Sequence, residues 1–475
     1  MTADAATNAA IAANRFGLGA KPGELVTLAG DPRGWLIGQL AGPYRVPEQL
    51  AGLASGREVL ATYFAAREAR EAARRAAKSG DPVKELVDGV REQLLPHYLA
   101  QAAARTRLAL ASPESFRERL VHFWSNHFAV SIDKPICLGT AGALENEAIR
   151  PRIAGRFIDL LLAVETHPAM VTYLDNQQSV GPNSEFATRA HRRGRFQSAQ
   201  PKNRIGLNEN LAREILELHT LGVDGGYTQG DVTSFAAVIT GWSVGGGKGR
   251  LAEGAPGTFV FRSQVHEPGS KTVLGRRYAD GGFEQGERVL NDLARHPSTA
   301  RHLATKLARH FVSDEPSPAL VDRLAKAYSA SDGNLNALYK ALVSSDEAWG
   351  VESRKFKTPA DFVQSAFRAL EVEPKDPKKL LSGVELLGQR NWSPGSPAGW
   401  PDRQVDWDGA DALMKRVEWS VALAERVGNA HSAIATADVA LGPLASEHTR
   451  TALARASSGS QALTLLLMSP EFQRR

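Results

Sequence analysis

The sequence predicts a mainly α-helical protein: one large multi-helix domain with a small β-hairpin excursion around residues 258–278. Two observations predict this fold class. Apolar residues recur at helical spacing along most of the 475 residues, between stretches rich in the helix formers Ala, Arg, Glu and Leu. Only "TFVF" and "KTVLGRRY", which flank the loop "HEPGS", alternate as short strands do. No repeat of fixed period is evident, so we expect a single domain over residues 1–475.

The composition is that of an ordinary globular chain. Hydrophobic residues make up 43% and charged residues 23%, so the chain can bury a sizeable core. The 57 basic and 52 acidic residues give a small, diffuse excess, and the short basic segment carries no aromatic platform, so no nucleic-acid partner is expected. The single cysteine, Cys137, excludes an internal disulfide and a cysteine-rich metal site.

The N-terminus lacks the basic start and apolar run of an export signal, and no apolar stretch reaches 18 residues. The chain as written is therefore expected to be soluble and cytoplasmic, with no membrane span. A removed signal, or export bound to a signal-bearing partner, stays open.

Four segments of the domain differ in composition from the rest. They are a charged helical segment (56–110), a basic mobile loop (184–205), the small β excursion (245–284) and a loop rich in Trp, Pro and Gly (390–410). The last of these contains Trp392, Trp400 and Trp407. Three tryptophans on one loop are explained either as a lid or stacking surface, or as plain anchors of the loop.

A helix is expected over residues 112–130, with Ser112 as its N-cap and Pro113 at its first position. On its polar side, His122 and Asn126 lie one turn apart. This helix therefore offers polar side chains that could reach a ligand.

Two histidines are expected on apolar helix faces: His127 on the helix just described and His219 on a later one. A lone histidine in such a place is usually a satisfied core residue. Two of them indicate a shared buried polar cluster, in which carboxylate neighbours can tune an imidazole for acid–base chemistry.

The stretch "GLNENLAREILELHTLGVDGGYTQ" (206–229) contains the densest group of polar residues. On a wheel of 100° per residue, its apolar arc holds Leu211, Ala212, Ile215, Leu218 and His219. A stripe at the edge of that arc holds Asn210, Glu214 and Glu217. Glu209 lies further round, near Arg213, so Glu209 and Glu214 cannot face the same ligand atom. Because a Gly-rich turn follows and a polar loop precedes this helix, we interpret it as a pocket wall rather than a solvent-exposed helix.

The stretch "YLDNQQSVGPNS" (173–184) contains Asp175, Asn176 and Asn183 without helical spacing. These side chains either build turns or form a hydrogen-bonding rim around a polar ligand. His266 lies at the tip of the predicted hairpin, and Trp242 ends a helix at "ITGW". Thr228 and Asp231 are spaced as a capping box at the start of that helix.

Several catalytic motifs are absent. The sequence contains no HExxH, no GxxxxGK[ST], no GxSxG and no GxGxxG after a strand. These absences argue against a zincin, a P-loop kinase and an ordinary serine hydrolase.

An ordered series of motifs resembles one known family. "RFGLGA", "ERLVHFWSNHFAVS", "YLDNQQSVGPNS", "GLNENLAREILELHTLGVDGGYTQ", "HEPGSKTVLG", "KLARHFV" and "GWPD" are similar, in that order, to the bacterial domain-of-unknown-function family 1800. The resemblance runs from Asn14 to the C-terminus. Ser125 departs from it, since many relatives carry a histidine there. The resemblance implies a neighbour in family 1501, whose members tend to carry twin-arginine export signals, and a periplasmic location if the two are exported together.

The first hypothesis is a hydrolase or lyase that acts on a polar polymer, with a glycan favoured, by paired carboxyl acid–base chemistry and without a cofactor. Glu214 and Asp175 form the expected pair, with Glu209 or Glu217 as substitutes and His127 as a further catalytic candidate. The predicted substrate-binding residues are Asn126, Asn176, Asn183, Asn208, Asn210, Arg213, His219, Trp242, His266 and Trp400.

Two alternatives stay open. A metal-dependent enzyme would hold one divalent ion with His127, His219, His266 and Glu214, because mixed histidine and carboxylate sets suit zinc, manganese or iron. A non-catalytic binding or assembly protein would use the tryptophan loop and the basic segment to contact an exported partner.

Overall fold

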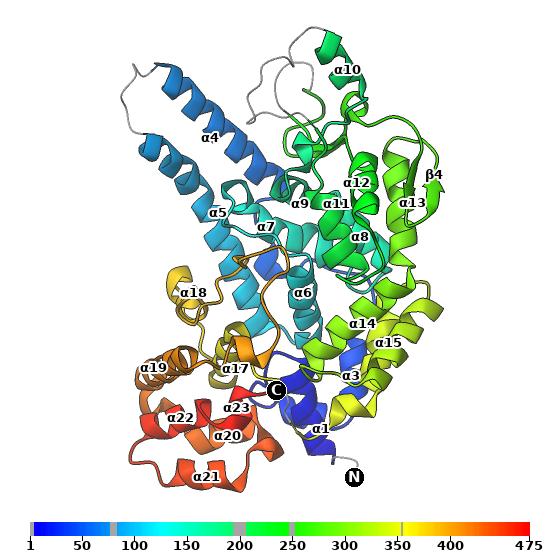
Figure 1. The fold of residues 1–475 in the computed structure, drawn as a ribbon. Coiled ribbons are helices and arrows are strands. Elements are labelled where there is room, and N and C mark those ends of the chain that lie inside the picture. Colours follow the sequence, from blue (N-terminus) through cyan, green and yellow to red (C-terminus); the bar gives the residue numbers. More distant parts are fainter. Residues whose placement is uncertain (1–3, 77–82, 193–205, 247–251, 353–354) are drawn as a thin grey trace.

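The computed structural model describes residues 4–76, 83–192, 206–246, 252–352 and 355–475. The chain is mainly helical, with two small antiparallel sheets between residues 242 and 278, which confirms the predicted fold class. Figure 1 shows the central helices stacked around α6 (Ser115–His127), with the C-terminal helices gathered below them, beside the N-terminal helix.

The larger hydrophobic core surrounds α6. Aromatic rings meet at its centre: Phe16 stacks on Phe311 at 5.8 Å between centroids, and the indole of Trp124 donates a hydrogen bond to the Tyr339 hydroxyl at 2.6 Å. Besides α6, the helices that contribute to it are α1 (Ala5–Ile11), α3 (Pro32–Gly38), α4 (Gly56–Ala76), α5 (Val83–Ala111), α7 (Thr140–Leu144), α8 (Phe157–Glu165), α9 (Pro168–Tyr173), α11 (Asn210–Glu214), α12 (Gln229–Val238), α13 (Phe283–Ala294), α14 (Pro297–Phe311), α15 (Pro318–Ala330) and α16 (Leu335–Ser344).

A second core lies at the C-terminal end, around Phe362 and Trp419. Its helices are α17 (Pro359–Leu370), α18 (Pro377–Leu386), α19 (Ala410–Val427), α20 (Ala433–Ala440), α21 (Glu447–Ala454), α22 (Gly459–Leu467) and α23 (Pro470–Gln473). The α5 helix belongs to both cores, since Leu94 packs into the first and Leu110 into the second. The α18 helix does the same, with Leu381 in the first core and Leu380 in the second. The two cores are thus joined along these two helices.

The two sheets pair differently from the predicted hairpin. Strand β1 (Trp242–Val244) pairs with β2 (Phe259–Phe261), and β3 (Lys271–Val273) pairs with β4 (Arg276–Tyr278). The turn of the second pair has positive φ at Leu274 and Gly275, the geometry of a two-residue hairpin turn. "KTVLGRRY" is therefore a hairpin by itself, and "TFVF" pairs upstream. The "HEPGS" loop lies between the two strand pairs in the sequence, and the Glu267 amide anchors it by donating to the Thr240 hydroxyl at 2.8 Å.

The start of α6 differs from the prediction as well. The helix begins at Ser115, because Glu114 has a non-helical ψ of 55°. The Ser112 hydroxyl accepts from the Glu114 amide instead of capping α6. The side-chain oxygen of Gln39 takes over the capping role and accepts from the amides of Phe116 and Arg117 at 2.9 and 3.2 Å.

Three helices pass into π-helical segments near α6: Ala12–Phe16, Glu145–Ile149 and Ile215–Thr220. The last one continues α11, so the later part of the 206–229 stretch departs from the regular wheel. His219 is buried as expected, but Leu218 is only half-buried. The predicted capping box is confirmed, since Thr228 and Asp231 exchange both of its hydrogen bonds at the start of α12.

Two shorter helices complete the chain, α2 (Glu24–Leu28) and α10 (Glu185–Arg192). The α10 helix lies where a basic loop was expected over 184–205, and the Ser184 hydroxyl accepts from the Ala187 amide at its start. The rest of that segment, 193–205, lies outside the described residues. In the portion of the chain that the structure covers, no helix is long and apolar enough to cross a membrane.

Candidate functional site

A polar cavity lies between α6 and the loop that joins α18 to α19. Its volume is about 90 Å³, enough for several water molecules. The α6 helix contributes His122, Ser125 and Asn126 to its wall, and the loop contributes Trp392 and Trp400. We call this the inner cavity.

A second cavity of about 270 Å³, the outer cavity, adjoins the first. Its own lining includes Phe123, His127, Lys306, Arg309, Arg403 and Asp406. The residues that line both cavities are Asn126, His310, Trp400, Pro401 and Asp402. These five residues therefore mark the junction of the two cavities.

The tryptophan loop is fastened to α6 by a reciprocal pair of hydrogen bonds. The Asn126 amide group donates to the Trp400 carbonyl at 2.9 Å, and the Trp400 amide donates to Asn126 Oδ1 at 2.7 Å. Gly399 lies against the same residue with a φ of +85°, and a Cβ there would fall 2.3 Å from the Asn126 carbonyl oxygen. Figure 1 shows this loop as the orange segment that lies across α6. The close approach requires glycine, which accounts for the "GWPD" sequence.

His310 and Asp402 form a pair at the junction. His310 Nδ1 lies 3.4 Å from Asp402 Oδ2, a long contact of the kind seen in ligand-free sites, and His310 Nε2 is buried with no partner among the described residues. Burial lowers the pKa of His310 to about 4, so the ring is neutral at pH 7. Although burial opposes ionisation of Asp402, His310 and the Lys355 ammonium hold the pKa of that carboxyl well below its usual range.

Behind the inner cavity, buried carboxylates link several arginines. Asp361 binds Arg119 and Arg475, each at 3.0 Å. Glu145 accepts from Arg105 at 2.8 Å and from the indole nitrogen of Trp392 at 3.1 Å. Each of these charges is matched by its neighbours, as a low-dielectric interior requires.

The wall of the inner cavity also includes Ser125 and His122. The Ser125 hydroxyl donates to Glu145, and Ser125 lines the inner cavity. His122 Nε2 has no partner within the part of the chain that is described, and burial lowers the pKa of His122 well below its usual range. His122 is therefore a neutral ring with an uncommitted nitrogen in the wall of the inner cavity.

Of the residues singled out from the sequence, Asn126, His127 and Trp400 line these cavities. His127 Nε2 donates to the His219 carbonyl at 3.1 Å, which leaves His127 Nδ1 buried and unpartnered in the described structure. His219 itself lies one layer deeper, with its Nδ1 2.8 Å from Glu165 Oε1. The two histidines are thus neighbours, with ring centroids 6.1 Å apart.

The amides of the 173–208 region are used to tie loops together. Asn176 donates to the carbonyls of Ile239 and Trp242, and Trp242 is fully buried against aromatic neighbours. Asn183 donates to Glu267 at 2.6 Å. Asn208 donates to the Leu174 carbonyl, and His266 faces the Thr240 carbonyl at 2.9 Å. These residues form one polar network that fixes the loop over 175–184.

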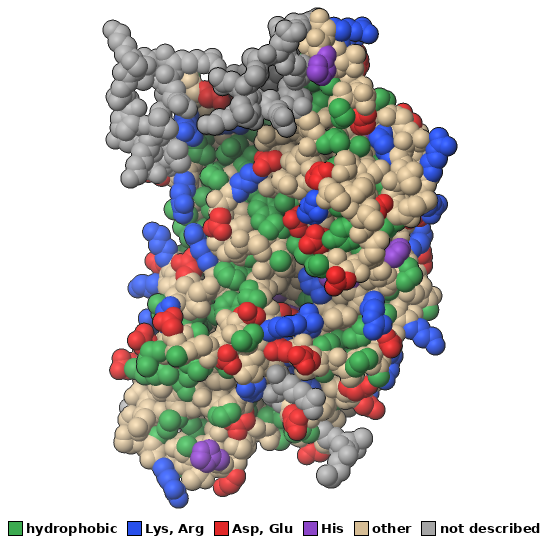
Figure 2. Space-filling model, viewed as in Figure 1, with side chains coloured by type: hydrophobic (Ala, Val, Ile, Leu, Met, Phe, Trp, Pro, Cys, Tyr) green, Lys and Arg blue, Asp and Glu red, His purple; other side chains and the backbone are tan. Residues whose placement is uncertain are grey.

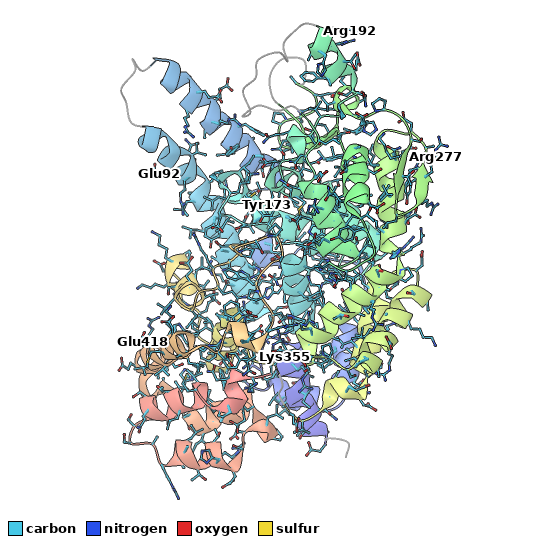
Figure 3. All side chains as sticks on the ribbon, viewed as in Figure 1. Glu92, Tyr173, Arg192, Arg277, Lys355 and Glu418 are labelled. Atoms are coloured by element: carbon cyan, nitrogen blue, oxygen red, sulfur yellow. The ribbon has the colours of Figure 1, made fainter. Side chains whose placement is uncertain are left out.

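The predicted acidic residues lie apart from the two cavities. Glu214 is half-buried, and burial raises its pKa. Asp175 forms an ion pair with Lys134 at 2.7 Å. Neither residue lines the inner or outer cavity. Figure 3 shows the separation, since Tyr173, two residues before Asp175, lies well away from Lys355, which contacts Asp402.

The remaining polar residues of the 206–229 stretch have protein partners or face solvent. Glu209 accepts from Arg213, Gln229 and Thr233, and these bonds hold its pKa below its usual range. Glu217 accepts from the Tyr227 hydroxyl. Asn210 is exposed.

The set proposed for a divalent ion is not gathered in one place. His127 and His219 are neighbours, but His219 is committed to Glu165 and His266 to Thr240. Within the described ranges, no group of three or more His, Cys, Asp or Glu side chains could hold a metal ion.

Several residues of the two cavities escaped the sequence analysis: Arg119, Lys306, His310, Asp361 and Asp402. They lie on α6, on α14, at the start of α17 and on the tryptophan loop. His310 stands in "KLARHFV" and Asp402 in "GWPD", two motifs of the family resemblance. Those motifs were the available signal, but no short-range spacing indicated that the two residues meet.

These observations define a class: a mainly helical protein with two joined polar cavities, buried ion pairs behind them and a tryptophan loop in front. The chain belongs to the family described as "Protein of unknown function (DUF1800)", whose model matches residues 11–474. No curated protein and no solved structure matches the chain significantly.

Proposed function

We propose that the chain is a hydrolase or lyase that cleaves a polar polymer by acid–base chemistry at the junction of the two cavities. The observation that carries this proposal is the His310–Asp402 pair, which lines both cavities and leaves His310 Nε2 without a partner in the described structure. A bond held at the junction would have one part of the substrate in each cavity.

The chemistry follows from the tautomer that Asp402 favours. The carboxylate accepts the proton on His310 Nδ1, so Nε2 carries a free lone pair. A neutral imidazole can take a proton from water for hydrolysis, or from a substrate carbon for elimination. The imidazolium that forms then returns this proton from Nε2 to the departing oxygen, while Arg119 and His122 in the wall of the inner cavity supply hydrogen-bond donors to that oxygen. Asp402 acts as a positioning residue.

A glycan is the favoured polymer. The Trp400 ring lies where the two cavities meet, and an indole face suits stacking against a sugar ring. The outer cavity is larger than the inner one, 270 against 90 Å³, which suits a chain that enters by one unit and continues outward. The ring centroids of Trp400 and Trp407 lie 6.0 Å apart, so the loop presents two neighbouring aromatic rings.

The carboxyl pair Glu214 and Asp175 stays a prediction for the catalytic groups. The raised pKa of Glu214 suits a general acid, and Asp175 forms an ion pair with Lys134. A glycosidase pair requires carboxyls roughly 5–10 Å apart across a cleft. Glu214→Gln therefore serves as the competing variant in the test below.

The test compares His310→Asn with Glu214→Gln on polysaccharides. An asparagine amide can replace His310 Nδ1 toward Asp402 but lacks Nε2, so we expect turnover to fall about 10²- to 10⁴-fold. New reducing ends report cleavage, and ultraviolet absorbance of unsaturated ends separates elimination from hydrolysis. His448→Asn, at an exposed position on α21, is the matched control and should retain full activity. If His310→Asn keeps wild-type turnover while Glu214→Gln loses it, the catalytic site belongs to the carboxyl pair.

A second candidate function is the binding or assembly of an exported partner, such as a protein of family 1501. One surface favours it: Met414, Val417 and Val421 on one side of α19 are 58%, 37% and 37% exposed. Such a stripe is typical of an interaction face. Co-expression with a family 1501 protein, followed by co-purification of the wild type but not of Val417→Glu, would support this candidate, and co-purification of both would contradict it.

A further inference from the structure

The outer cavity has an excess of positive charge. Its basic side chains are those of Lys306, Arg309 and Arg403. Its two carboxylates are those of Asp402 and Asp406, and Asp402 is already shared between His310 and Lys355. The basic side chains therefore outnumber the carboxylates that are free to neutralise them. Figure 2 shows basic and acidic side chains side by side in the middle of the face it displays.

Lys306 is the most unusual member of this group. It lies one turn before His310 on α14, and its ammonium group has no hydrogen bond or ion pair within the described residues. Burial lowers the pKa of Lys306 to about 8. Asp402 is the carboxylate that attracts this half-buried ammonium, but Asp402 is already shared with His310 and Lys355. A ligand that supplies a further negative charge would complete the neutralisation.

The two arginines are only partly used. Arg309 donates its Nε to the Asp314 carbonyl at 3.1 Å, and the structure gives its side chain no carboxylate partner within the described ranges. The same holds for the side chain of Arg403 in the described part of the chain. Guanidinium groups with free donors bind planar carboxylates and sulfate esters through paired hydrogen bonds.

An acceptor also lies in the same wall. His127 is 1% exposed, donates from Nε2 to the His219 carbonyl and leaves Nδ1 unpartnered in the described structure. A neutral ring in this tautomer accepts a hydrogen bond, which a ligand hydroxyl could donate. The cavity thus offers cationic donors for an anion, and an unpartnered imidazole nitrogen is buried in its wall.

We propose that the outer cavity is a subsite for an anionic sugar unit, with the Lys306 ammonium binding its carboxylate or sulfate. The volume of 270 Å³ is close to the lower end of small-molecule sites, roughly 300 Å³. This inference deepens the proposed glycan cleavage and rests on it for the role of the bound unit, but the binding step can be measured without turnover. It makes the substrate an acidic polysaccharide rather than a neutral one.

The experiment measures binding of three oligosaccharides by titration calorimetry: oligogalacturonate, sulfated dextran oligomer and unsulfated dextran oligomer. The wild type should bind one or both anionic probes and bind unsulfated dextran at least tenfold more weakly, because a hydrogen bond to a charged group is worth about 1.5–3 kcal/mol. The carboxylate and sulfate arms decide which anion the subsite takes. Lys306→Gln should weaken anionic binding about 10- to 100-fold.

Two controls separate ligand binding from folding. Lys326→Gln removes an exposed lysine from the neighbouring α15 helix and should leave affinity unchanged. Thermal unfolding of Lys306→Gln should occur at the wild-type temperature or above it, because the change removes a half-buried charge that has no hydrogen bond or ion pair among the described residues. A structural role for Lys306 would instead lower the unfolding temperature.

Each outcome decides one of the two proposals. Equal affinity of wild type and Lys306→Gln for the anionic probes, or binding of unsulfated dextran as tight as that of the better anionic probe, overturns the anionic subsite. Tight anionic binding without cleavage would leave the subsite standing and reject the catalytic proposal. Cleavage of neutral dextran at the same rate as acidic polymers would leave the catalytic proposal standing and reject the anionic subsite.

Discussion

Replacing Gly399 with alanine is expected to detach the tryptophan loop from α6. The residue has a φ of +85°, and an added Cβ would lie 2.3 Å from the Asn126 carbonyl oxygen and 2.7 Å from its Oδ1. A left-handed φ costs a non-glycine residue about 1–3 kcal/mol. Relief of the clash would also break the two Asn126–Trp400 hydrogen bonds, at about 1 kcal/mol each. We therefore expect the docked loop to lose about 3 kcal/mol or more.

Hydrogen exchange of the loop is the direct assay, read on peptides that cover residues 390–410 and the end of α6. Gly395→Ala provides a control on the same loop, because an added Cβ at Gly395 meets nothing within 4 Å. The Gly399→Ala protein should exchange much faster in both peptides and lose polysaccharide cleavage, while Gly395→Ala should match the wild type. Unchanged protection in Gly399→Ala would refute the reasoning, since the contact could then not be what holds the loop.

Two further predictions concern stability. Asp361→Asn leaves Arg119 and Arg475 without their shared carboxylate and should cost about 3–5 kcal/mol in urea unfolding. Although burial opposes ionisation of Asp361, the two arginines hold the pKa of this carboxyl well below its usual range. The stability that Asp361 contributes is therefore present above about pH 4 and is lost as the pH falls. Asp361→Asn should accordingly lose less stability in acid than the wild type, and an unchanged acid profile would contradict this. Gln39→Ala removes the cap of α6 and should cost about 1–2 kcal/mol. An unchanged urea midpoint would show that water caps the helix equally well.

Local patterns in the sequence identified much of the fold. Helical periodicity gave the fold class, and the Thr228–Asp231 spacing gave a capping box that the structure confirms. Contacts between distant segments could not be predicted from local patterns, because they depend on which segments meet in the folded chain. Gln39 caps a helix 77 residues away, and no local rule could select it over Ser112.

The residues of the candidate site also divide into those that local patterns identified and those that depend on distant contacts. Asn126 and Trp400 could be singled out because one lies on the polar side of a helix and the other on a tryptophan-rich loop. His310 belongs to an amphipathic helix whose pattern looks ordinary, and its importance comes from Asp402, which is 92 positions further along the sequence but only 3.4 Å away. The polar loop over 173–184 had two possible readings, and its Asn176 side chain is used to bind backbone carbonyls.

In the motif "WSNHF" on α6, the first four side chains each contact a different part of the protein. The Trp124 indole donates to Tyr339 in the core, while Ser125 donates to Glu145 in the cavity wall. Asn126 fastens the tryptophan loop, and His127 donates to the carbonyl of His219. Because a helix turns by about 100° at each residue, four consecutive side chains must point in four directions. The 206–229 stretch therefore meets the outer cavity through His127: its π-helical turn presents the His219 carbonyl, which accepts from His127 Nε2 and fixes the tautomer of a ring that lines this cavity.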